Sequence, residues 1–228
     1  MGTGTGSIYG QDPRLGPGGD LRTTRIGLID YGAGNLGCVR NALKYLGLNF
    51  FCICEPDQMS EATHLILPGV GAFASAMRRL EELRMVEALQ VQLLVKNKPF
   101  LGICVGMQIL ATYGREFGDY QGLGVIEGTV ERIDAEFHML RVPHVGWNEL
   151  DIRRPSVLFA NMPEAPIFYF VHSYQLVTRP EIVLATCSYG CEITAAVEMH
   201  NIYGVQFHPE KSQRDGLQLL RNFAAIED

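Results

Sequence analysis

Between residues 25 and 113, short apolar runs alternate with longer segments in which apolar residues recur every three or four positions. The short runs predict buried strands, and the periodic segments predict helices. The expected strands occupy residues 25–29, 49–54, 64–67 and 99–103, and the expected helices occupy residues 36–46 (capped by Asn35), 72–83, 85–96 and 105–113. Strands that alternate with helices pair in parallel through right-handed crossovers. This half of the chain therefore predicts an α/β fold with a mostly parallel open sheet flanked by helices.

Beyond residue 125 the pattern changes to short segments rich in β-branched and aromatic residues, separated by turns. These segments lie at residues 125–133, 147–152, 167–169, 174–177, 182–187 and 193–198. They predict an antiparallel section added to the parallel core, and residues 213–225 predict a closing amphipathic helix. Because 228 residues suit one sizeable domain, we expect a single domain over residues 25–228.

Residues 1–24 are rich in glycine, proline and serine, and we expect them to form a flexible tail outside the fold. They lack the apolar core of a signal peptide, and no apolar run long enough for a membrane span follows. We therefore expect a cytoplasmic protein with reduced thiols and no membrane partner. The net charge of −6, with scattered lysines and arginines, argues against nucleic-acid binding. The cysteines and histidines show no paired ligand spacing, so neither a metal nor a cofactor is expected.

One cysteine stands where the sequence predicts a sharp turn from a strand into a helix. Cys104 follows the apolar run 99–103, and Gly102 and Gly106 flank it. Small residues at these positions allow a tight turn and the close approach of a substrate. The cysteine side chain would then project from the carboxyl edge of the sheet, near free N–H groups of the next helix, as a nucleophile does. The alternative is an inert buried thiol.

A candidate base follows later in the chain. His208 comes after the apolar run 202–207 and before Pro209, which ends the strand because proline has no N–H to donate. A histidine beside a thiol can take its proton, and a carboxylate such as Glu210 can fix the orientation of the ring. A histidine that caps a strand at the surface is the alternative. The presence of Cys104 at another strand end of the same sheet favours the catalytic interpretation.

These residues resemble the class I, or triad, glutamine amidotransferases, and within them the glutaminase subunit of imidazole glycerol phosphate synthase. The resemblance covers Arg25 to about Phe223 and implies a flavodoxin-like fold. The motifs that carry it are Asp30-Tyr-Gly-Ala-Gly-Asn-Leu36, Pro68-Gly-Val-Gly-Ala-Phe73, Leu101-Gly-Ile-Cys-Val-Gly-Met-Gln108, Pro143-His-Val-Gly-Trp-Asn148, Phe170-Val-His-Ser-Tyr174 and Gly204-Val-Gln-Phe-His-Pro-Glu-Lys-Ser212. The elbow around Cys104 is shared by the superfamily, whereas the segment 143–148 points to this subunit.

The resemblance implies that Cys104 attacks the side-chain amide of L-glutamine and forms a γ-glutamyl thioester. His208 would take the thiol proton, protonate the departing ammonia and then activate water, while Glu210 orients its ring. The backbone N–H of Val105 is a natural oxyanion donor, and the family points to the N–H of Val70 for the second. Because glycines stand on both sides of Val70, its peptide is expected to flip as an on/off switch; a plain β-turn is the alternative.

The resemblance also assigns glutamine-binding roles to the matching positions of this sequence. Gln108 lies one helical turn after Cys104 and is expected to face the same pocket. Glu116 is expected to receive the α-ammonium group, with a solvated surface charge as the alternative. The remaining contacts are expected from Gly71, His172, Ser173 and Tyr174.

The resemblance also implies a heterodimer with a (β/α)8-barrel cyclase, which uses the ammonia to make imidazole glycerol phosphate and AICAR in histidine biosynthesis. The expected docking residues are His144, Val145, Gly146, Trp147, Asn148 and Lys211. Trp147 suits an interface anchor, with core packing as the alternative, and Lys211 would pair with an acidic group of the partner.

Other functions stay open. The family usually has methionine where this chain has Val145, and related glutaminase subunits serve sugar amidotransferases in surface-polysaccharide synthesis. A stand-alone γ-glutamyl hydrolase would act without a partner, and a non-catalytic interaction module would not need the triad. A dinucleotide site at Gly32-x-Gly34 is disfavoured because the third glycine of that fingerprint is absent.

Overall fold

The computed structural model describes residues 23–32, 36–134 and 140–226. The expected tail falls almost wholly outside these ranges, and so does Asn35, the expected helix cap. Of the helices within these ranges, none is long and apolar enough to cross a membrane.

The described chain is built on an eight-stranded sheet in the order β2-β1-β3-β4-β14-β13-β12-β9. The first five strands pair in parallel, and the last three continue the sheet with antiparallel pairing. In sheet order the strands are β2 (Phe50–Ile53), β1 (Ile26–Ile29), β3 (His64–Gly69), β4 (Phe100–Cys104), β14 (Ile202–Val205), β13 (Cys191–Met199), β12 (Val183–Tyr189) and β9 (Asp151–Ile152). The α/β fold with a mostly parallel sheet and an added antiparallel section is therefore confirmed.

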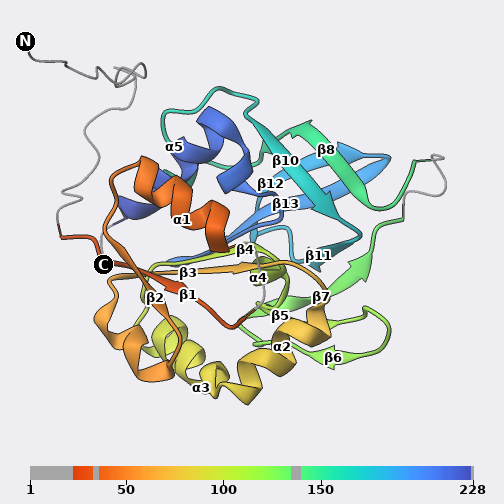
Figure 1. The fold of residues 1–228 in the computed structure, drawn as a ribbon. Helices are drawn as coiled ribbons and strands as arrows, with labels where there is room; N and C mark the ends of the chain where they lie inside the picture. The colour runs from red at the N-terminus through yellow and green to blue at the C-terminus, as the bar shows by residue number, and fades with distance from the viewer. Residues whose placement is uncertain (1–22, 33–35, 135–139, 227–228) are drawn as a thin grey trace, which may run out of the picture.

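Helices cover both faces of the parallel strands, as Figure 1 shows, with α1 and α5 above the sheet and α2 and α3 below it. Their bounds are α1 (Leu36–Tyr45), α2 (Phe73–Glu82), α3 (Met85–Gln90), which a π-helical turn at Val91–Val95 continues, and α5 (Gln213–Ala224). Each long helix turns an apolar stripe to the sheet; in α5 the stripe includes the buried residues Leu219, Leu220 and Phe223. Strands covered on both faces are buried throughout, as in β1, β3, β4 and β14.

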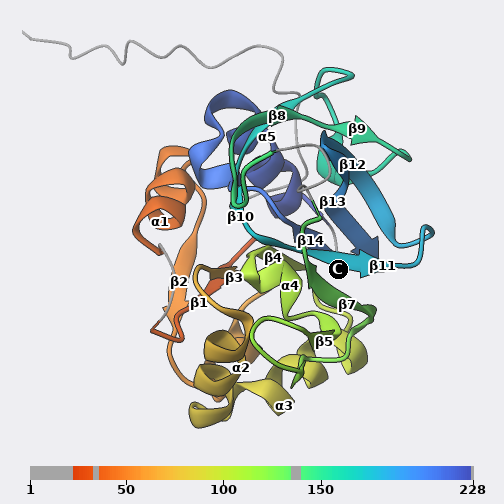
Figure 2. The ribbon, with the colours of Figure 1, turned by 90° about the vertical axis from the view of Figure 1, so that its right-hand side faces the viewer.

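Two smaller sheets complete the structure. One pairs β8 (His144–Glu149) with β10 (Ile167–His172), and the other has the order β11-β7-β5-β6. The bounds of the latter strands are β11 (Tyr174–Thr178), β7 (Ile126–Arg132), β5 (Ala111–Gly114) and β6 (Tyr120–Gln121). In Figure 2 the short helix α4 (Val105–Gln108), which follows β4, lies between the β8–β10 pair above and strands β5 and β7 below. The two small sheets therefore flank the carboxyl end of the parallel strands.

Two sequence-based predictions about elements were wrong. The helix expected over residues 105–113 ends after one turn at Gln108, and residues 111–114 form strand β5 instead, paired with β6 and β7. Tertiary pairing has overridden a local pattern that suits a helix. The strand expected over residues 147–152 is divided between two sheets, because the buried residue Leu150 separates β8, which pairs with β10, from β9, which pairs with β12.

Candidate active site

Cys104 lies at the turn from β4 into α4, with backbone angles of φ 56° and ψ −109°. Non-glycine residues rarely adopt this region, which costs about 1–3 kcal/mol and is common at functional sites. The thiol is free, and Cys104 is 4% exposed. The elbow predicted from the sequence is present. However, α4 has only one turn, so nearby peptide N–H groups rather than a long helix dipole are available to an anion.

The two glycines that flank Cys104 are required by close backbone contacts. A Cβ atom on Gly106 would lie 1.9 Å from the carbonyl oxygen of Leu67 in β3. A Cβ atom on Gly102 would lie 2.4 Å from the carbonyl oxygen of Gly106. The Gly-x-Cys-x-Gly pattern thus lets β4, α4 and β3 pack at backbone distance, which holds the cysteine at the sheet edge.

His208 and Glu210 form a buried pair just beyond the end of β14. The distance from His208 Nδ1 to Glu210 Oε1 is 2.8 Å, and the side chains are 1% and 2% exposed. Burial alone would lower the pKa of His208, but the Cys104 and Glu210 side chains outweigh it and raise this pKa from 6.5 to about 9. Both neighbouring side chains therefore favour the protonated ring, although its Nε2 has no hydrogen bond in the described part of the chain.

Strand β10 holds this segment in place. The N–H of His208 donates to the carbonyl oxygen of Tyr169 at 2.9 Å. The hydroxyl of Ser212 donates to the carbonyl oxygen of His208 at 2.6 Å and accepts from the N–H of Tyr169 at 3.0 Å. The position of the histidine thus depends on the pair of strands that contains the expected docking segment.

Gln206 is a site residue that the sequence analysis missed. It is fully buried, and its Nε2 donates to Cys104 Sγ at 3.7 Å. Its Oε1 accepts from Gln108 Nε2 at 3.0 Å. A polar residue between Val205 and Phe207 in an otherwise apolar run was the available signal, because buried amides need partners.

A pocket of about 580 Å³ lies at the carboxyl end of the parallel strands and brings together all but one of the predicted catalytic, oxyanion and glutamine-binding residues. Those that line it are Val70, Gly71, Cys104, Val105, Gln108, Glu116, His172, Ser173, Tyr174 and His208. Glu210 lies behind the ring of His208 rather than in the pocket wall. Ala72, Pro143 and Val171 complete the lining and were not predicted.

Two of these residues, Glu116 and Gln108, have additional structural roles, whereas Val70 is exposed. The Glu116 carboxylate accepts the N–H of Phe73, the first residue of α2, at 2.7 Å, so it anchors that helix as well as lining the pocket. Gln108 is 4% exposed, and its Nε2 also donates to the Tyr174 carbonyl oxygen at 2.9 Å. Val70 is 41% exposed, and Gly71 beside it has a φ of 96°, which only glycine adopts easily.

Strand β8 carries most of the expected docking residues, and its two faces differ. Val145 and Trp147 are exposed, at 55% and 49%, and Trp147 contacts the Tyr169 ring edge-to-face, so it is not packed in the core. Lys211 lies over the ring of Tyr169, with its Nζ 5.9 Å from the ring centre. His144, in contrast, is 2% exposed, so its side chain does not belong to the exposed face of β8.

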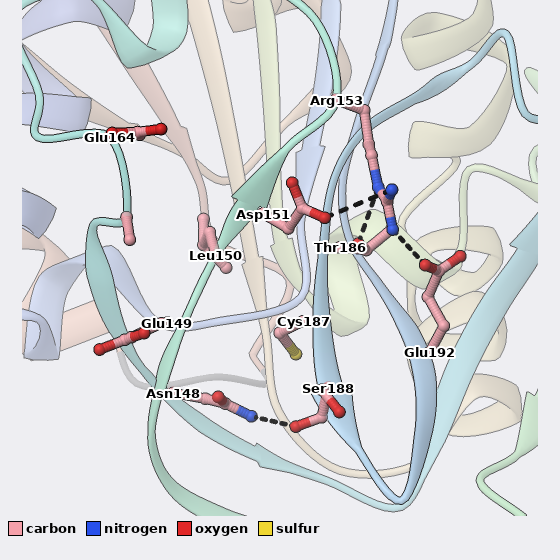
Figure 3. Close-up of a pocket in the computed structure, with 11 residues that line it drawn as sticks. Asn148, Glu149, Leu150, Asp151, Arg153, Glu164, Thr186, Cys187, Ser188 and Glu192 are labelled. Carbon is pink, nitrogen blue, oxygen red and sulfur yellow. Dashed lines mark hydrogen bonds and ion pairs between the residues drawn. The ribbon is translucent and has the colours of Figure 1, made fainter.

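A second hollow, of about 660 Å³, lies beside β8, β9 and β12 (Figure 3). Arg153 bridges Asp151, Glu192 and the hydroxyl of Thr186 there, and the Asn148 amide donates to the carbonyl oxygen of Ser188 at 2.8 Å. Its lining includes neither the expected nucleophile nor the expected base.

Comparisons with known proteins identify the family. Residues 28–226 match the family described as glutamine amidotransferase class-I. A relative from Zymomonas mobilis, named imidazole glycerol phosphate synthase subunit HisH, is 48% identical over 206 residues, or 88% of this chain and 95% of the relative. The relative named subunit HisH 1 from Campylobacter jejuni (strain 81-176) is 45% identical over 201 residues, or 88% of this chain and all of the relative.

Among solved structures, a glutamine amidotransferase from Thermotoga maritima matches with a TM-score of 0.64 over 88% of this chain and 96% of that chain. At 18% identity this likeness concerns the fold alone. The expectation of a glutamine amidotransferase, drawn from the motifs, is confirmed by the family match. The chain belongs to the class-I glutamine amidotransferase family.

Proposed function

We propose that this chain is the glutaminase subunit of an imidazole glycerol phosphate synthase and supplies ammonia to a (β/α)8-barrel cyclase. The observation that carries the proposal is the gathering of the predicted catalytic, oxyanion and glutamine-binding residues around one pocket. The names of the relatives, which are HisH subunits of that synthase at 45–48% identity, support the pathway.

In the first half of the reaction, the Cys104 thiolate adds to the carboxamide carbon of L-glutamine. The N–H groups of Val105 and Val70 stabilise the tetrahedral oxyanion, and removal of one such donor typically costs about 10²–10³ in rate. The His208 imidazolium, whose pKa of about 9 keeps it protonated at neutral pH, donates its proton to the departing nitrogen. Ammonia leaves, and the γ-glutamyl group stays on sulfur as a thioester.

In the second half, neutral His208 takes a proton from water, and the resulting hydroxide attacks the thioester carbon. The C–S bond breaks, glutamate leaves, and the thiolate–imidazolium pair is restored. Glu210 holds the ring by its bond to Nδ1, so that Nε2 serves both half-reactions. Gln206, which donates to the sulfur, stabilises the thiolate between turnovers.

The partner would dock on the exposed face of β8 and β10. Val145, Trp147 and Ile167 are apolar and exposed on these strands, and Lys211 lies beside them. An exposed tryptophan next to a cation is typical of an interface anchor. Docking there would place the partner close to His208, since the segment 208–212 hydrogen-bonds to Tyr169 of β10.

The test is glutamate release from L-glutamine by the chain alone and with the purified cyclase subunit and its nucleotide ligand. We expect weak hydrolysis alone, strong stimulation in the complex, and none in Cys104→Ala. A glutamine-analogue electrophile should add mass to wild-type Cys104 but not to the variant. Absence of hydrolysis in every complex, together with an unmodified thiol, would overturn the proposal. Stimulation by a sugar amidotransferase instead of the cyclase would support surface-polysaccharide synthesis, the alternative raised by Val145.

A further inference from the structure

A continuous series of hydrogen bonds joins strand β8 to the sulfur of Cys104. His144 Nδ1 lies 3.1 Å from His172 Nε2, and His172 Nδ1 lies 2.9 Å from the carbonyl oxygen of Tyr174. The same carbonyl oxygen accepts from Gln108 Nε2 at 2.9 Å. Gln108 then donates to Gln206, and Gln206 donates to Cys104 Sγ.

The chemistry of the groups allows only one arrangement of ring protons. A carbonyl oxygen only accepts, so His172 must donate from Nδ1, which leaves Nε2 of the neutral ring as an acceptor. His144 must therefore donate from Nδ1 to His172, which leaves its own Nε2 as an acceptor. The amide nitrogen of Asn148, 3.5 Å from that Nε2, is a donor. The Tyr174 carbonyl thus fixes the tautomer of His172, and His172 in turn fixes that of His144.

The two rings are held neutral and rigid. His144 and His172 are 2% and 6% exposed, and burial lowers the pKa of each ring from 6.5 to about 4. His144 also stacks between two aromatic rings, with centroid distances of 4.0 Å to Tyr189 and 4.8 Å to Phe170. A buried network in which every member is paired specifies one geometry, since an unpaired member would be costly.

Strand β8 connects this network to the surface. Successive side chains of a strand point to opposite faces, so His144 and Asn148 face inward while Val145 and Trp147 face outward. The inward Asn148 contacts His144. Its amide also donates to the carbonyl oxygen of Ser188 in β12, as Figure 3 shows. A shift of β8 along its axis would therefore move the donor that His172 depends on.

We propose that His144 is a positioning residue for glutamine hydrolysis: by donating to His172 it fixes the Tyr174 carbonyl, and so Gln108 and Gln206, beside Cys104. Binding of a partner to the outer face of β8 then reaches the nucleophile through the inner face of the same strand. This inference rests on the glutaminase function proposed above and adds the route by which docking affects the site.

Two substitutions separate the hydrogen bond of His144 from its packing. His144→Phe keeps a planar ring between Tyr189 and Phe170 but removes the donor. His144→Asn loses the ring but keeps a donor nitrogen at the position of Nδ1. His64→Phe is the matched control, because His64 is 3% exposed, its ring nitrogens are hydrogen-bonded, and it begins β3 at the end opposite the pocket.

Glutamate release is measured for the wild type and the three variants in complex with the cyclase subunit, and stability is measured by urea unfolding. We expect kcat/KM to fall about tenfold in His144→Phe, to recover to within about threefold of wild type in His144→Asn, and to stay at the wild-type value in His64→Phe. The two Phe variants should lose similar stability. Ring ¹⁵N NMR should show wild-type His172 protonated at Nδ1 and not at Nε2.

If the wild type is active and His144→Phe has the same kcat/KM, the inference is overturned, while the glutaminase function stays intact. So would a His144→Asn variant that is folded but as slow as His144→Phe, because ring shape rather than the donor would then matter. A His172 ring protonated at Nε2 would contradict the proton arrangement directly. A wild type without activity would instead remove the proposed function.

Discussion

Replacement of Gly106 by alanine tests whether backbone contact at the elbow sets the position of the nucleophile. The added methyl carbon would lie 1.9 Å from the carbonyl oxygen of Leu67, whereas real Cβ atoms essentially never come closer than 3.0 Å. The two backbones must therefore separate by more than about 1 Å. Neither group belongs to a flexible side chain, so β3 and α4 have to move, and Cys104 moves with α4.

We expect two effects of Gly106→Ala. Overpacking of this kind costs about 1–3 kcal/mol of unfolding free energy. Displacement of a reacting atom by about 1 Å can lower the rate about 100-fold. Urea unfolding measures the first effect, and kcat for glutamate release in the presence of the partner measures the second.

The matched control is Gly204→Ala in β14. Its methyl carbon would lie 2.8 Å from Cγ and 3.1 Å from Cβ of Met107, and 3.0 Å from Cγ2 of Val197, which are all side-chain atoms. The nearest of these atoms needs to give way by only about 0.2 Å to reach 3.0 Å, so we expect a loss of about 1 kcal/mol or less and a rate close to wild type. If Gly106→Ala matched Gly204→Ala in both stability and rate, backbone contact at Gly106 would not set the position of Cys104.

Three further predictions concern other parts of the site. Since the pKa of His208 is raised from 6.5 to about 9, its contribution to stability is fully present below pH 6.5 and is lost as the pH rises through about 9. Urea unfolding should therefore show the advantage of wild type over Glu210→Gln shrinking between these pH values; a constant difference would contradict this. Glu116→Ala removes the hydrogen bond to the N–H of Phe73, so it should lower the free energy of unfolding by about 1 kcal/mol and also raise KM for glutamine. Glu116→Gln should raise KM only. Urea unfolding measures the first effect and steady-state kinetics the second. Trp147→Ala should weaken partner affinity by about 2 kcal/mol in calorimetry with little change in unfolding free energy, because the side chain is half exposed; unchanged affinity would place the interface elsewhere.

The sequence was sufficient to predict the elbow around Cys104 and the histidine at another strand end. Both rest on local rules: small residues at a tight turn and a proline that ends a strand. The parallel pairing then brings them to one edge, because strand β4 lies directly between β3 and β14. Long-range proximity could therefore be inferred without knowledge of the contacts.

Other features depend on contacts that no local pattern encodes. The apolar residues Leu110 and Ala111 suit a continued helix, yet the chain leaves α4 because residues 111–114 pair with β6 and β7. The burial of His144 follows from the register of β8 against β10, where it lies opposite His172. Gln206 gains its role only when Gln108 and the sulfur are next to it.

The strained backbone at Cys104 affects which substitutions the fold would favour at this position during evolution. Glycine would adopt φ 56° and ψ −109° with far less strain, so the proposed nucleophile is also a residue that the folded chain would be more stable without. A copy of this chain released from the proposed glutaminase function would therefore gain stability by exchanging this cysteine for glycine.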